Sequence, residues 1–232
     1  MIKRSGFLEW DSDFFGFPVA FIEVCLGNER QVKAELDNFF SAGCKLVYVF
    51  SHKPLELSDY DACLADRKRS YILSKPIFKE IGNQHINIEN HAEMLYELAY
   101  QAGIHSRYRT DPHIPEDTFK RLYSIWIDNS INKGFADYVL ACIEQEKAVG
   151  LITAKKKNNE ISIGLFATDQ EFRGKGIGSR LIQEIINIGA NENLQVEVTT
   201  QADNPKACKF YEDKGFEIKD EEFVYHVWNV QI

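Results

Sequence analysis

The stretch that decides the fold reads Thr-Asp-Gln-Glu-Phe-Arg-Gly-Lys-Gly-Ile-Gly-Ser and covers residues 168–179. A β-branched and apolar run, residues 161–168, precedes it. An amphipathic helix pattern follows, with apolar residues at Leu181, Ile182, Ile185 and Ile186. Three glycines at a strand-to-helix junction let the backbone turn tightly, so that N–H groups converge on one point. The start of the helix adds roughly half a positive charge there. The stretch therefore predicts a site for a phosphate or a pyrophosphate.

Spacing excludes two familiar phosphate-binding loops. A Walker A loop would need glycine where Asp169 stands and serine or threonine after Lys175, where Gly176 stands. A dinucleotide fingerprint needs glycines spaced two and then three apart, whereas Gly174, Gly176 and Gly178 are spaced two and two. A helix start that is merely rich in glycine remains an alternative, although each glycine inside a helix costs about 1 kcal/mol relative to alanine.

The pattern that fits is Arg-x-x-Gly-x-Gly, formed by Arg173, Gly176 and Gly178. Here the chain resembles the GNAT superfamily of acyl-CoA-dependent N-acetyltransferases. A second segment, Asn204-Pro-Lys-Ala-Cys-Lys-Phe-Tyr211-Glu-Asp-Lys-Gly-Phe216, resembles the family's Asn-x-x-Ala-x-x-x-Tyr-x-x-x-Gly-Phe block. The resemblance implies acetyl-CoA as cosubstrate, with its pyrophosphate on the glycine loop.

The resemblance also implies which residues bind acetyl-CoA. They are Phe166, Ala167, Thr168, Arg173, Gly174, Lys175, Gly176, Ile177, Gly178, Ser179, Asn204, Ala207 and Tyr211. Tyr211 falls on the motif tyrosine, which implies that its phenol, with an ordinary pKa near 10, protonates the departing CoA sulfur. The alternative is that Tyr211 packs its helix against the sheet. Asn204 is expected to bond the pantetheine arm, to cap a helix, or to do both.

The strand that ends at residues 164–168 is expected to separate from its neighbour and to pair with pantetheine. The family places a β-bulge there, which would leave the N–H of Phe166 or Ala167 to polarise the thioester carbonyl. The sequence shows no evident general base. Glu160 and Glu197 alternate with apolar neighbours, as solvent-facing residues do, and a water relay to the amine is an equal alternative.

Composition narrows the class of protein. The chain has 232 residues, 44% of them hydrophobic and 27% charged, which is ordinary for a globular protein with a sizeable core. No apolar run approaches the ~20 residues of a membrane span, and the first residues lack the apolar core of a secretion signal. The five cysteines are scattered and form no CxxC motif, so no disulfide framework is indicated. The histidines form no HExxH motif, so no metal site is indicated either. We expect a cytoplasmic protein with no membrane partner.

The charge distribution bears on partners. A net charge of −8 argues against nonspecific binding to nucleic acid. An acidic protein that binds a polyanionic cosubstrate must concentrate positive charge locally. Arg173, Lys175 and Arg180 are predicted to do so at the glycine loop, with Lys206 and Lys209 near them in sequence.

The second half of the chain has a readable order of elements. The patterns predict strand 86–89, helix 90–102, a polar loop 106–115, helix 116–130, a hairpin 138–154, strand 161–168, a helix ending near residue 189, strand 195–200, a helix from Asn204, and a final hairpin 217–229. The predicted fold class is α/β (α+β), a GNAT fold with a mixed central sheet flanked by helices. The catalytic domain is predicted over residues 85–232.

Residues 1–80 are predicted to form a smaller amino-terminal α/β module. Residues 7–25 are rich in strand formers, residues 29–42 read as a helix, and residues 45–52 and 71–74 read as strands. The stretch 47–73 resembles a degenerate copy of 196–227, with a strand, a polar turn, a short helix and a strand. Such a half-GNAT unit and a chance similarity are both open, and residues 75–84 are the expected linker.

A closer resemblance concerns the acceptor. Residues 8–16, the Ser-Arg-Tyr-Arg stretch that ends at Arg109 and the Tyr123-x-x-Trp126 pattern look like the TDP-fucosamine N-acetyltransferase subfamily. This implies direct transfer, in a ternary complex, to the amine of a TDP-4-amino-4,6-dideoxyhexose for surface polysaccharide. The substrate-binding candidates are Arg107 and Arg109 for the diphosphate and Tyr108 or Trp10 for thymine or sugar. An exposed polar loop and a core tryptophan are the alternatives.

Two other classes of function stay open. One is a GNAT enzyme that acetylates a protein or peptide amine, or another small amine. The other is a non-catalytic acyl-CoA sensor, against which the intact Asn204 and Tyr211 argue. The sequence leaves the oligomeric state open, with a homodimer among the alternatives.

Overall fold

The computed structural model describes residues 1–25, 29–80, 86–87, 92–132 and 134–230. The chain divides into two compact units. The first unit comprises Met1–Arg69, Gln201–Asp203 and Asp220–Ile232. The second unit comprises Ser70–Thr200 and Asn204–Lys219. The carboxyl-terminal end of the chain therefore groups with the amino-terminal residues, and the predicted domains 1–80 and 85–232 stay a prediction.

The first unit is a small sheet with helices. Its elements are β1 (Ile2–Phe7), α1 (Glu9–Phe15), β2 (Val19–Val24), α2 (Glu29–Ser41), β3 (Leu46–Ser51) and parts of β4 (Asp61–Leu73) and β10 (Glu217–Trp228). Strand β2 pairs antiparallel with β1 and parallel with β3, and β3 pairs antiparallel with β10. The buried face of α2, with Val32, Leu36 and Phe39, packs on this sheet. These elements confirm the helix predicted at 29–42 and the strand predicted at 45–52.

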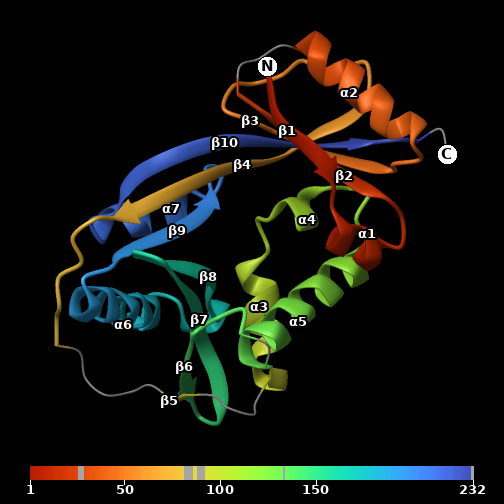
Figure 1. The fold of residues 1–232 in the computed structure, drawn as a ribbon. Helices are drawn as coiled ribbons and strands as arrows, with labels where there is room; N and C mark the ends of the chain where they lie inside the picture. The colour runs from red at the N-terminus through yellow and green to blue at the C-terminus, as the bar shows by residue number, and fades with distance from the viewer. Residues whose placement is uncertain (26–28, 81–85, 88–91, 133, 231–232) are drawn as a thin grey trace. The chain divides into compact units, whose positions relative to one another are not determined.

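The second unit contains most of the predicted catalytic elements (Figure 1). They are β5 (Ile86–Asn87), the 3-10 helix η1 (Ala92–Leu95), α3 (Tyr96–Ala102), α4 (Arg107–Thr110), α5 (Glu116–Asn132), β6 (Tyr138–Glu144), β7 (Lys147–Lys157), β8 (Glu160–Thr168), the 3-10 helix η2 (Gln170–Phe172), α6 (Ile177–Glu192), β9 (Gln195–Gln201) and α7 (Pro205–Asp213). The strand order in this unit is β4-β9-β8-β7-β6-β5. Strands β5 to β8 pair antiparallel in sequence, whereas β8 and β9 pair parallel. The mixed sheet flanked by helices confirms the predicted fold class.

The core of the second unit lies between its sheet and the helices α6 and α7. The four apolar residues predicted for one face of α6 are all buried: Leu181, Ile182, Ile185 and Ile186. They pack with Val196 and Val198 of β9 and with Ile161 and Ile163 of β8. This packing anchors the helix whose start carries the glycine loop.

Helix α1 lies within residues 7–25, which are rich in strand formers. Trp10 and Phe14, four positions apart, stack with ring centroids 5.3 Å apart. Ser12 donates its hydroxyl to the carbonyl of Leu8, and Gly16 ends the helix with φ of 76°. Because i,i+4 aromatic pairs and a left-handed end favour a helix, they outweigh the strand propensity of the same aromatic residues.

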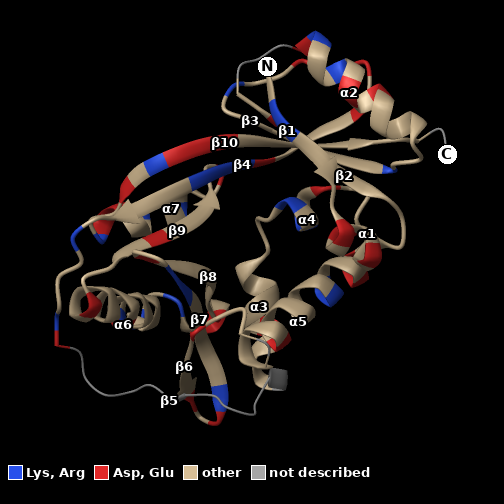
Figure 2. Cartoon of the chain, viewed as in Figure 1, with Lys and Arg blue, Asp and Glu red and all other residues tan. Residues whose placement is uncertain are grey.

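Strand β10 corrects the predicted final hairpin, because it runs unbroken through the acidic residues 220–222. Glu221 lies 3.1 Å from Arg67 and 2.6 Å from Arg69, both on β4. Glu222 lies 3.4 Å from Lys68. Figure 2 shows the basic stretch of β4 beside the acidic stretch of β10. The charges that read as a turn are therefore cross-strand pairs, which stabilise a sheet.

Two further predictions need correction. Residues 52–60, all of them described, contain no helix, and β4 begins at Asp61, so the proposed copy of the GNAT unit lacks its helix. The polar loop predicted at 106–115 contains helix α4, with Tyr108 and Asp111 buried. The strand predicted at 86–89 is described only at Ile86–Asn87, and residues 88–91 lie outside the described residues.

The described part of the expected linker runs along α6. Two buried amides of that helix hold it. Asn187 accepts the N–H of Lys79 at 2.9 Å and donates to its carbonyl at 2.8 Å. Gln183 donates to the carbonyl of Ile77 at 3.4 Å and to the Asn187 side chain at 3.0 Å. These amides satisfy linker backbone groups as a neighbouring strand would.

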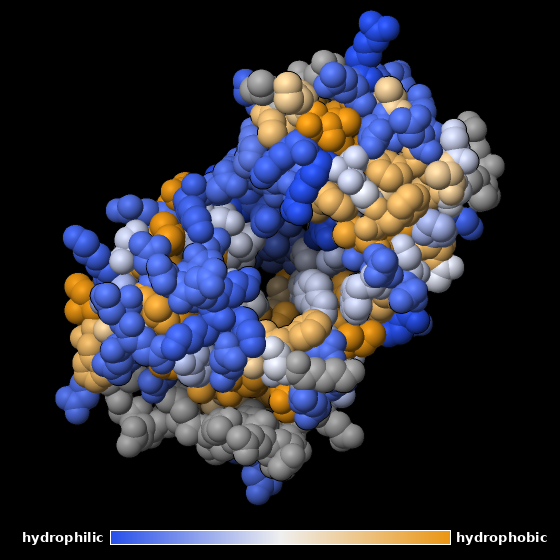
Figure 3. Space-filling model, in the orientation of Figure 1, coloured by the Kyte–Doolittle hydropathy of each residue, from blue (hydrophilic) through white to orange (hydrophobic). Residues whose placement is uncertain are grey.

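Figure 3 shows hydrophilic residues over most of the visible face of each unit, with hydrophobic residues in patches. Among the described helices, none combines the length and the apolar character needed to cross a membrane.

Candidate active site

The glycine loop connects β8 to α6 and is open to solvent. Gly174 and Gly176 each have φ of 79°, the left-handed region that favours glycine. A Cβ built on either one would meet no atom within 4 Å. Gly176 is the N-cap of α6, and no side chain in the described part of the chain caps this helix. The first N–H groups of α6, including those of Ile177 and Ser179, are therefore directed at an open, uncapped end.

An ion pair that the sequence did not predict, the Asp169–Lys147 brace, links the glycine loop to β7. Asp169 is 6% exposed, accepts the N–H of Glu171 at 3.0 Å and pairs with Lys147 at 2.9 Å. The Lys147 ammonium, by hydrogen bonding, lowers the pKa of the Asp169 carboxyl. The Lys175 ammonium lies 4.1 Å from the centroid of the Phe172 ring. Asp169 and Lys147 come from separate stretches of chain, so spacing within the motif could not reveal them.

The start of α6 lies close to the end of β8. A Cβ on Gly178 would stand 3.2 Å from the Thr168 hydroxyl and 3.5 Å from the Phe166 ring. The carbonyl of Thr168 accepts a hydrogen bond from Arg173 at 3.2 Å. Arg180 lies 3.9 Å from Glu144 of β6. Arg173 and Lys175, both exposed, are thus the cations that the loop presents to solvent.

Strands β8 and β9 separate beside this loop, as expected. Their parallel pairing covers Glu160–Ile163 of β8, and the strand continues past it to Thr168. On the other side of β8, two residues, Gly164 and Leu165, oppose the single residue Thr153 of β7. This is a β-bulge. The Thr153 hydroxyl accepts the N–H of Leu165 at 2.8 Å and so fills the broken ladder.

The bulge determines which N–H groups face the separated side. The N–H groups of Leu165 and Asp169 both donate toward β7. Because successive N–H groups of a strand alternate in direction, the N–H of Ala167 also points to β7. The N–H of Phe166 points the other way, into the separation between β8 and β9. Of the two backbone groups considered, Phe166 is therefore the one placed to meet a ligand there.

Helix α7 begins at the second motif. Asn204 caps it, its side-chain oxygen accepting the N–H of Ala207 at 3.2 Å. Its amide nitrogen has no hydrogen-bond partner among the described residues. The capping alternative for Asn204 is therefore confirmed, and the amide nitrogen can still donate to a ligand.

Tyr211 lies in the last turn of α7, inside an aromatic cluster. It is 5% exposed, and its ring lies 5.8 Å from Tyr71, 5.5 Å from Phe210 and 6.4 Å from Phe166. Its hydroxyl has no hydrogen-bond partner among the described residues. Burial raises the pKa of the phenol, so it keeps its proton at physiological pH. The ring packs the helix, and the hydroxyl is a donor without an acceptor.

The predicted acceptor-binding residues of the second unit lie on α4. Arg107 covers the Tyr108 ring, 4.5 Å from its centroid, and donates to its hydroxyl at 2.5 Å. Tyr108 is 7% exposed and meets Trp126 edge to face, so its ring is already covered. Arg109 is exposed, lies 3.7 Å from Glu116 and extends over the Phe119 ring.

Trp10 belongs to the first unit. It lies on α1, stacks on Phe14 and is 43% exposed. The alternative of a core tryptophan is therefore wrong.

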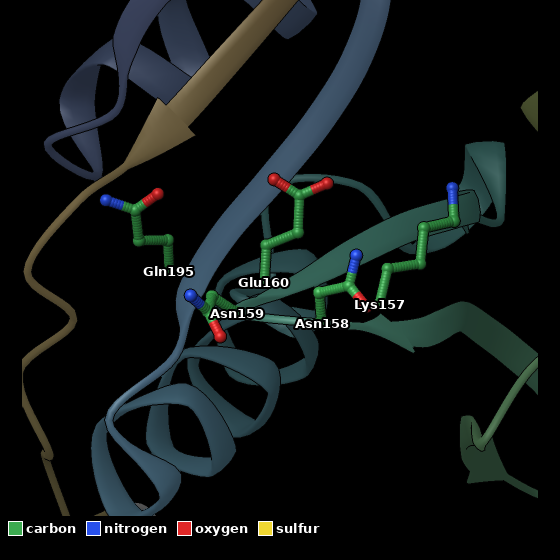
Figure 4. Close-up of a pocket in the computed structure, with 5 residues that line it drawn as sticks. All are labelled: Lys157, Asn158, Asn159, Glu160 and Gln195. Atoms are coloured by element: carbon green, nitrogen blue, oxygen red, sulfur yellow. The ribbon is translucent and has the colours of Figure 1, made fainter.

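The two carboxylates weighed as bases share a lysine. Lys219 lies 2.7 Å from Glu197 and 3.6 Å from Glu160. Glu160 also lines a pocket with Lys157, Asn158 and Asn159 around the β7–β8 turn and with Gln195 at the start of β9 (Figure 4). That turn is at the opposite end of β8 from the glycine loop, about 26 Å away at the usual rise per strand residue.

These features fit an acyl-CoA. The uncapped, glycine-lined start of α6 suits a pyrophosphate. The separated strands suit an extended chain that adds backbone hydrogen bonds. Asn204 and Tyr211, the N-cap and a last-turn residue of α7, have polar atoms without partners among the described residues. The arrangement can bind an acyl-CoA by its pyrophosphate and place an N–H and a phenol beside its thioester.

Comparison with known proteins agrees with this geometry. The model of the acetyltransferase (GNAT) family matches residues 95–216, more than half of the chain. A solved structure, the tandem GNAT protein from the clavulanic acid biosynthesis pathway, has a TM-score of 0.57 at 12% identity and covers 91% of this chain and 75% of its own. It shows that the fold is shared.

Two curated relatives are described with different functions. The spore coat polysaccharide biosynthesis protein SpsD of Bacillus subtilis is 27% identical over 160 residues, 68% of this chain and 54% of that protein. The chain thus spans about half the length of SpsD. N-alpha-acetyltransferase 30 of Schizosaccharomyces pombe is 24% identical over 100 residues, 40% of this chain and 67% of that protein. The chain therefore belongs to the acetyltransferase (GNAT) family.

Proposed function

We propose that the protein transfers the acetyl group of acetyl-CoA directly to the amine of a nucleotide-linked amino sugar, a TDP-4-amino-4,6-dideoxyhexose, within a ternary complex. The observation that carries the transfer step is the position of Tyr211, a buried and protonated phenol in one aromatic cluster with Phe166 of the separated strand. Cytoplasmic action in surface polysaccharide synthesis follows from the same proposal.

The glycine loop and the two strands would bind the cosubstrate. Backbone N–H groups from Gly174 to Ser179 would hold the pyrophosphate, with Arg173 and Lys175 adding charge. The edge of β8 from Phe166 to Thr168 would pair with the pantetheine arm, and Asn204 would donate its free amide hydrogens to it. Ala207 lines the same helix face as Tyr211.

Two groups of this chain would then assist acyl transfer. The N–H of Phe166 would stabilise the negative charge that grows on the thioester oxygen as the amine attacks. The Tyr211 phenol would donate its proton to the sulfur as the carbon–sulfur bond breaks. Because its pKa is raised by burial, the phenol is present in the acid form before each turnover.

The amine must lose a proton to react. Lys219 pairs with both Glu160 and Glu197, and Glu160 lies at the end of β8 opposite the glycine loop. We therefore assign deprotonation of the amine to water rather than to either carboxylate.

Two observations support the acceptor class. SpsD, which matches 68% of this chain, is described as a polysaccharide biosynthesis protein. Helix α4 presents Arg107 and Arg109, and guanidinium groups suit a nucleotide diphosphate. Trp10 remains a predicted contact for thymine or sugar, and Tyr108 would support Arg107 rather than stack on the base itself. A homodimer remains a proposal.

Removing either arginine should weaken acceptor binding alone. We expect Arg107→Ala and Arg109→Ala each to raise the acceptor KM about ten- to hundredfold, the loss of one charge-assisted hydrogen bond. The KM for acetyl-CoA should not change. Arg4→Ala, which removes an exposed, ion-paired arginine of the first unit, is the matched control. Wild-type kinetics in both α4 variants, or failure of TDP to compete with the acceptor, would exclude a diphosphate at α4.

A peptide amine is the second candidate acceptor. It is favoured by the match to N-alpha-acetyltransferase 30, which covers 40% of this chain. The two candidates differ in the competitor, because TDP should inhibit only the nucleotide-sugar reaction, and a peptide with a free amino terminus should be acetylated only in the other case.

A further inference from the structure

The end of β4 places a second tyrosine against Tyr211. Tyr71 is fully buried, and its ring centroid lies 5.8 Å from that of Tyr211. Its hydroxyl donates to the Glu212 carboxylate at 2.8 Å. Strand β4 is the neighbour of β9, and Figure 1 shows its end beside α7. A strand from an earlier part of the chain therefore contacts the catalytic helix at two consecutive residues.

The hydrogen bond from Tyr71 to Glu212 favours one geometry of this contact. Leaving a buried hydroxyl without a partner is costly, so Tyr71 is held to its acceptor. That acceptor is a carboxylate, and hydrogen bonds to charged groups are about twice as strong as neutral ones. The bond therefore fixes the rotation of the last turn of α7, from which the Tyr211 side chain projects.

Other contacts of Tyr211 leave this role open. Its carbonyl accepts the N–H groups of Lys214 and Phe216, which fix the backbone. Its ring meets Phe210 and Phe216 without any directional bond. Since the Tyr211 hydroxyl has no partner among the described residues, no hydrogen bond of its own sets its direction.

We propose that Tyr71 is a positioning residue, which aims the Tyr211 phenol through ring contact and through its hydrogen bond to Glu212. The inference rests on the proposed role of Tyr211 as the acid. It gives β4 a part in the chemistry that neither GNAT motif contains.

The test compares two tyrosine–glutamate pairs of the second unit. Tyr71→Phe removes only the hydroxyl bonded to Glu212. Tyr138→Phe removes the matching bond of Tyr138 to Glu192 at 3.2 Å, on β6 and α6. With acetyl-CoA and TDP-4-amino-4,6-dideoxygalactose, Tyr71→Phe should lower kcat roughly tenfold, since small misplacements of a reacting group are costly. The KM for acetyl-CoA should hold, and Tyr138→Phe should match wild type.

Two variants separate positioning from folding. Glu212→Gln keeps an oxygen acceptor for Tyr71 and should retain most of kcat, whereas Glu212→Ala should behave as Tyr71→Phe does. In a Tyr211→Phe background, Tyr71→Phe should lower kcat no further, although its effect on the melting temperature should persist.

A second readout needs no acceptor. In carbon-13 spectra of ring-labelled tyrosine, the Tyr211 signal is the one lost in Tyr211→Phe. Tyr71→Phe should shift or broaden it, and Tyr138→Phe should leave it in place.

Two results would overturn the inference while leaving the acid role intact: an unmoved Tyr211 signal with control-level kcat in Tyr71→Phe, or an additive loss in the double variant. Wild-type kcat in Tyr211→Phe alone would overturn both, because no acid would remain to be positioned.

Discussion

Replacing Tyr211 by phenylalanine is expected to lower kcat by ~100-fold or more, the range that general acid catalysis supplies. The change keeps the ring and its contacts with the aromatic cluster and removes only the hydroxyl. Acetyl-CoA affinity should change little, because the pyrophosphate site on α6 is untouched. Steady-state kinetics and calorimetry measure the two quantities separately.

The structure indicates that Tyr211→Phe should keep the stability of the wild-type protein. Because the Tyr211 hydroxyl has no hydrogen-bond partner among the described residues, its removal should not lower the melting temperature. A stable variant that turns over at the wild-type rate would leave Tyr211 a packing residue only.

The Tyr211 phenol also predicts how kcat depends on pH. Burial raises the pKa of the Tyr211 phenol above its ordinary value near 10, and a phenol is protonated below its pKa. Loss of the acid should therefore cause no fall in kcat below about pH 10. Deprotonation of the amine acceptor should instead set the acidic limb of the profile.

Gly176→Val is expected to weaken acetyl-CoA binding about ten- to hundredfold, the loss of one charge-assisted hydrogen bond. Gly176 has φ of 79°, where a β-branched residue is strained. The new Cβ meets no protein atom within 4 Å, so it projects into the open space in front of α6. Both effects act on the N–H groups that would hold the pyrophosphate. Calorimetric titration with acetyl-CoA measures the result.

Gly16→Val is the matched control for this change. Gly16 ends α1 in the first unit with φ of 76°, and its Cβ would also meet nothing within 4 Å. It should carry the same backbone strain without altering acetyl-CoA affinity. Equal affinity in folded Gly176→Val and wild-type protein would remove the pyrophosphate from this loop.

Local motifs made the centre of the site predictable. The start of α6, the cap at Asn204 and the burial of the α6 apolar face all follow from residues close in sequence. Left-handed glycines and caps act within one turn of chain, so their pattern is visible without the fold.

Features that depend on distant partners were missed or misread. The Asp169–Lys147 brace joins the loop to the start of β7. The acidic stretch of β10 read as a turn until its partners on β4 were known. The separation of β8 could be anticipated, but the register of its bulge depends on the Thr153 hydroxyl of the neighbouring strand. Cross-strand pairs of this kind leave no fixed spacing in the sequence.

The most direct test of the proposed function is a thiol-release assay with acetyl-CoA and a panel of acceptors. The panel contains TDP-4-amino-4,6-dideoxyhexoses, the same sugars as 1-phosphates without the nucleotide, and peptides with free amino termini. We expect thiol release with a TDP-amino sugar, a product heavier by one acetyl group, and much weaker activity without the nucleotide. Thiol release with peptides alone, or acetylation that does not depend on the nucleotide, would contradict the proposal.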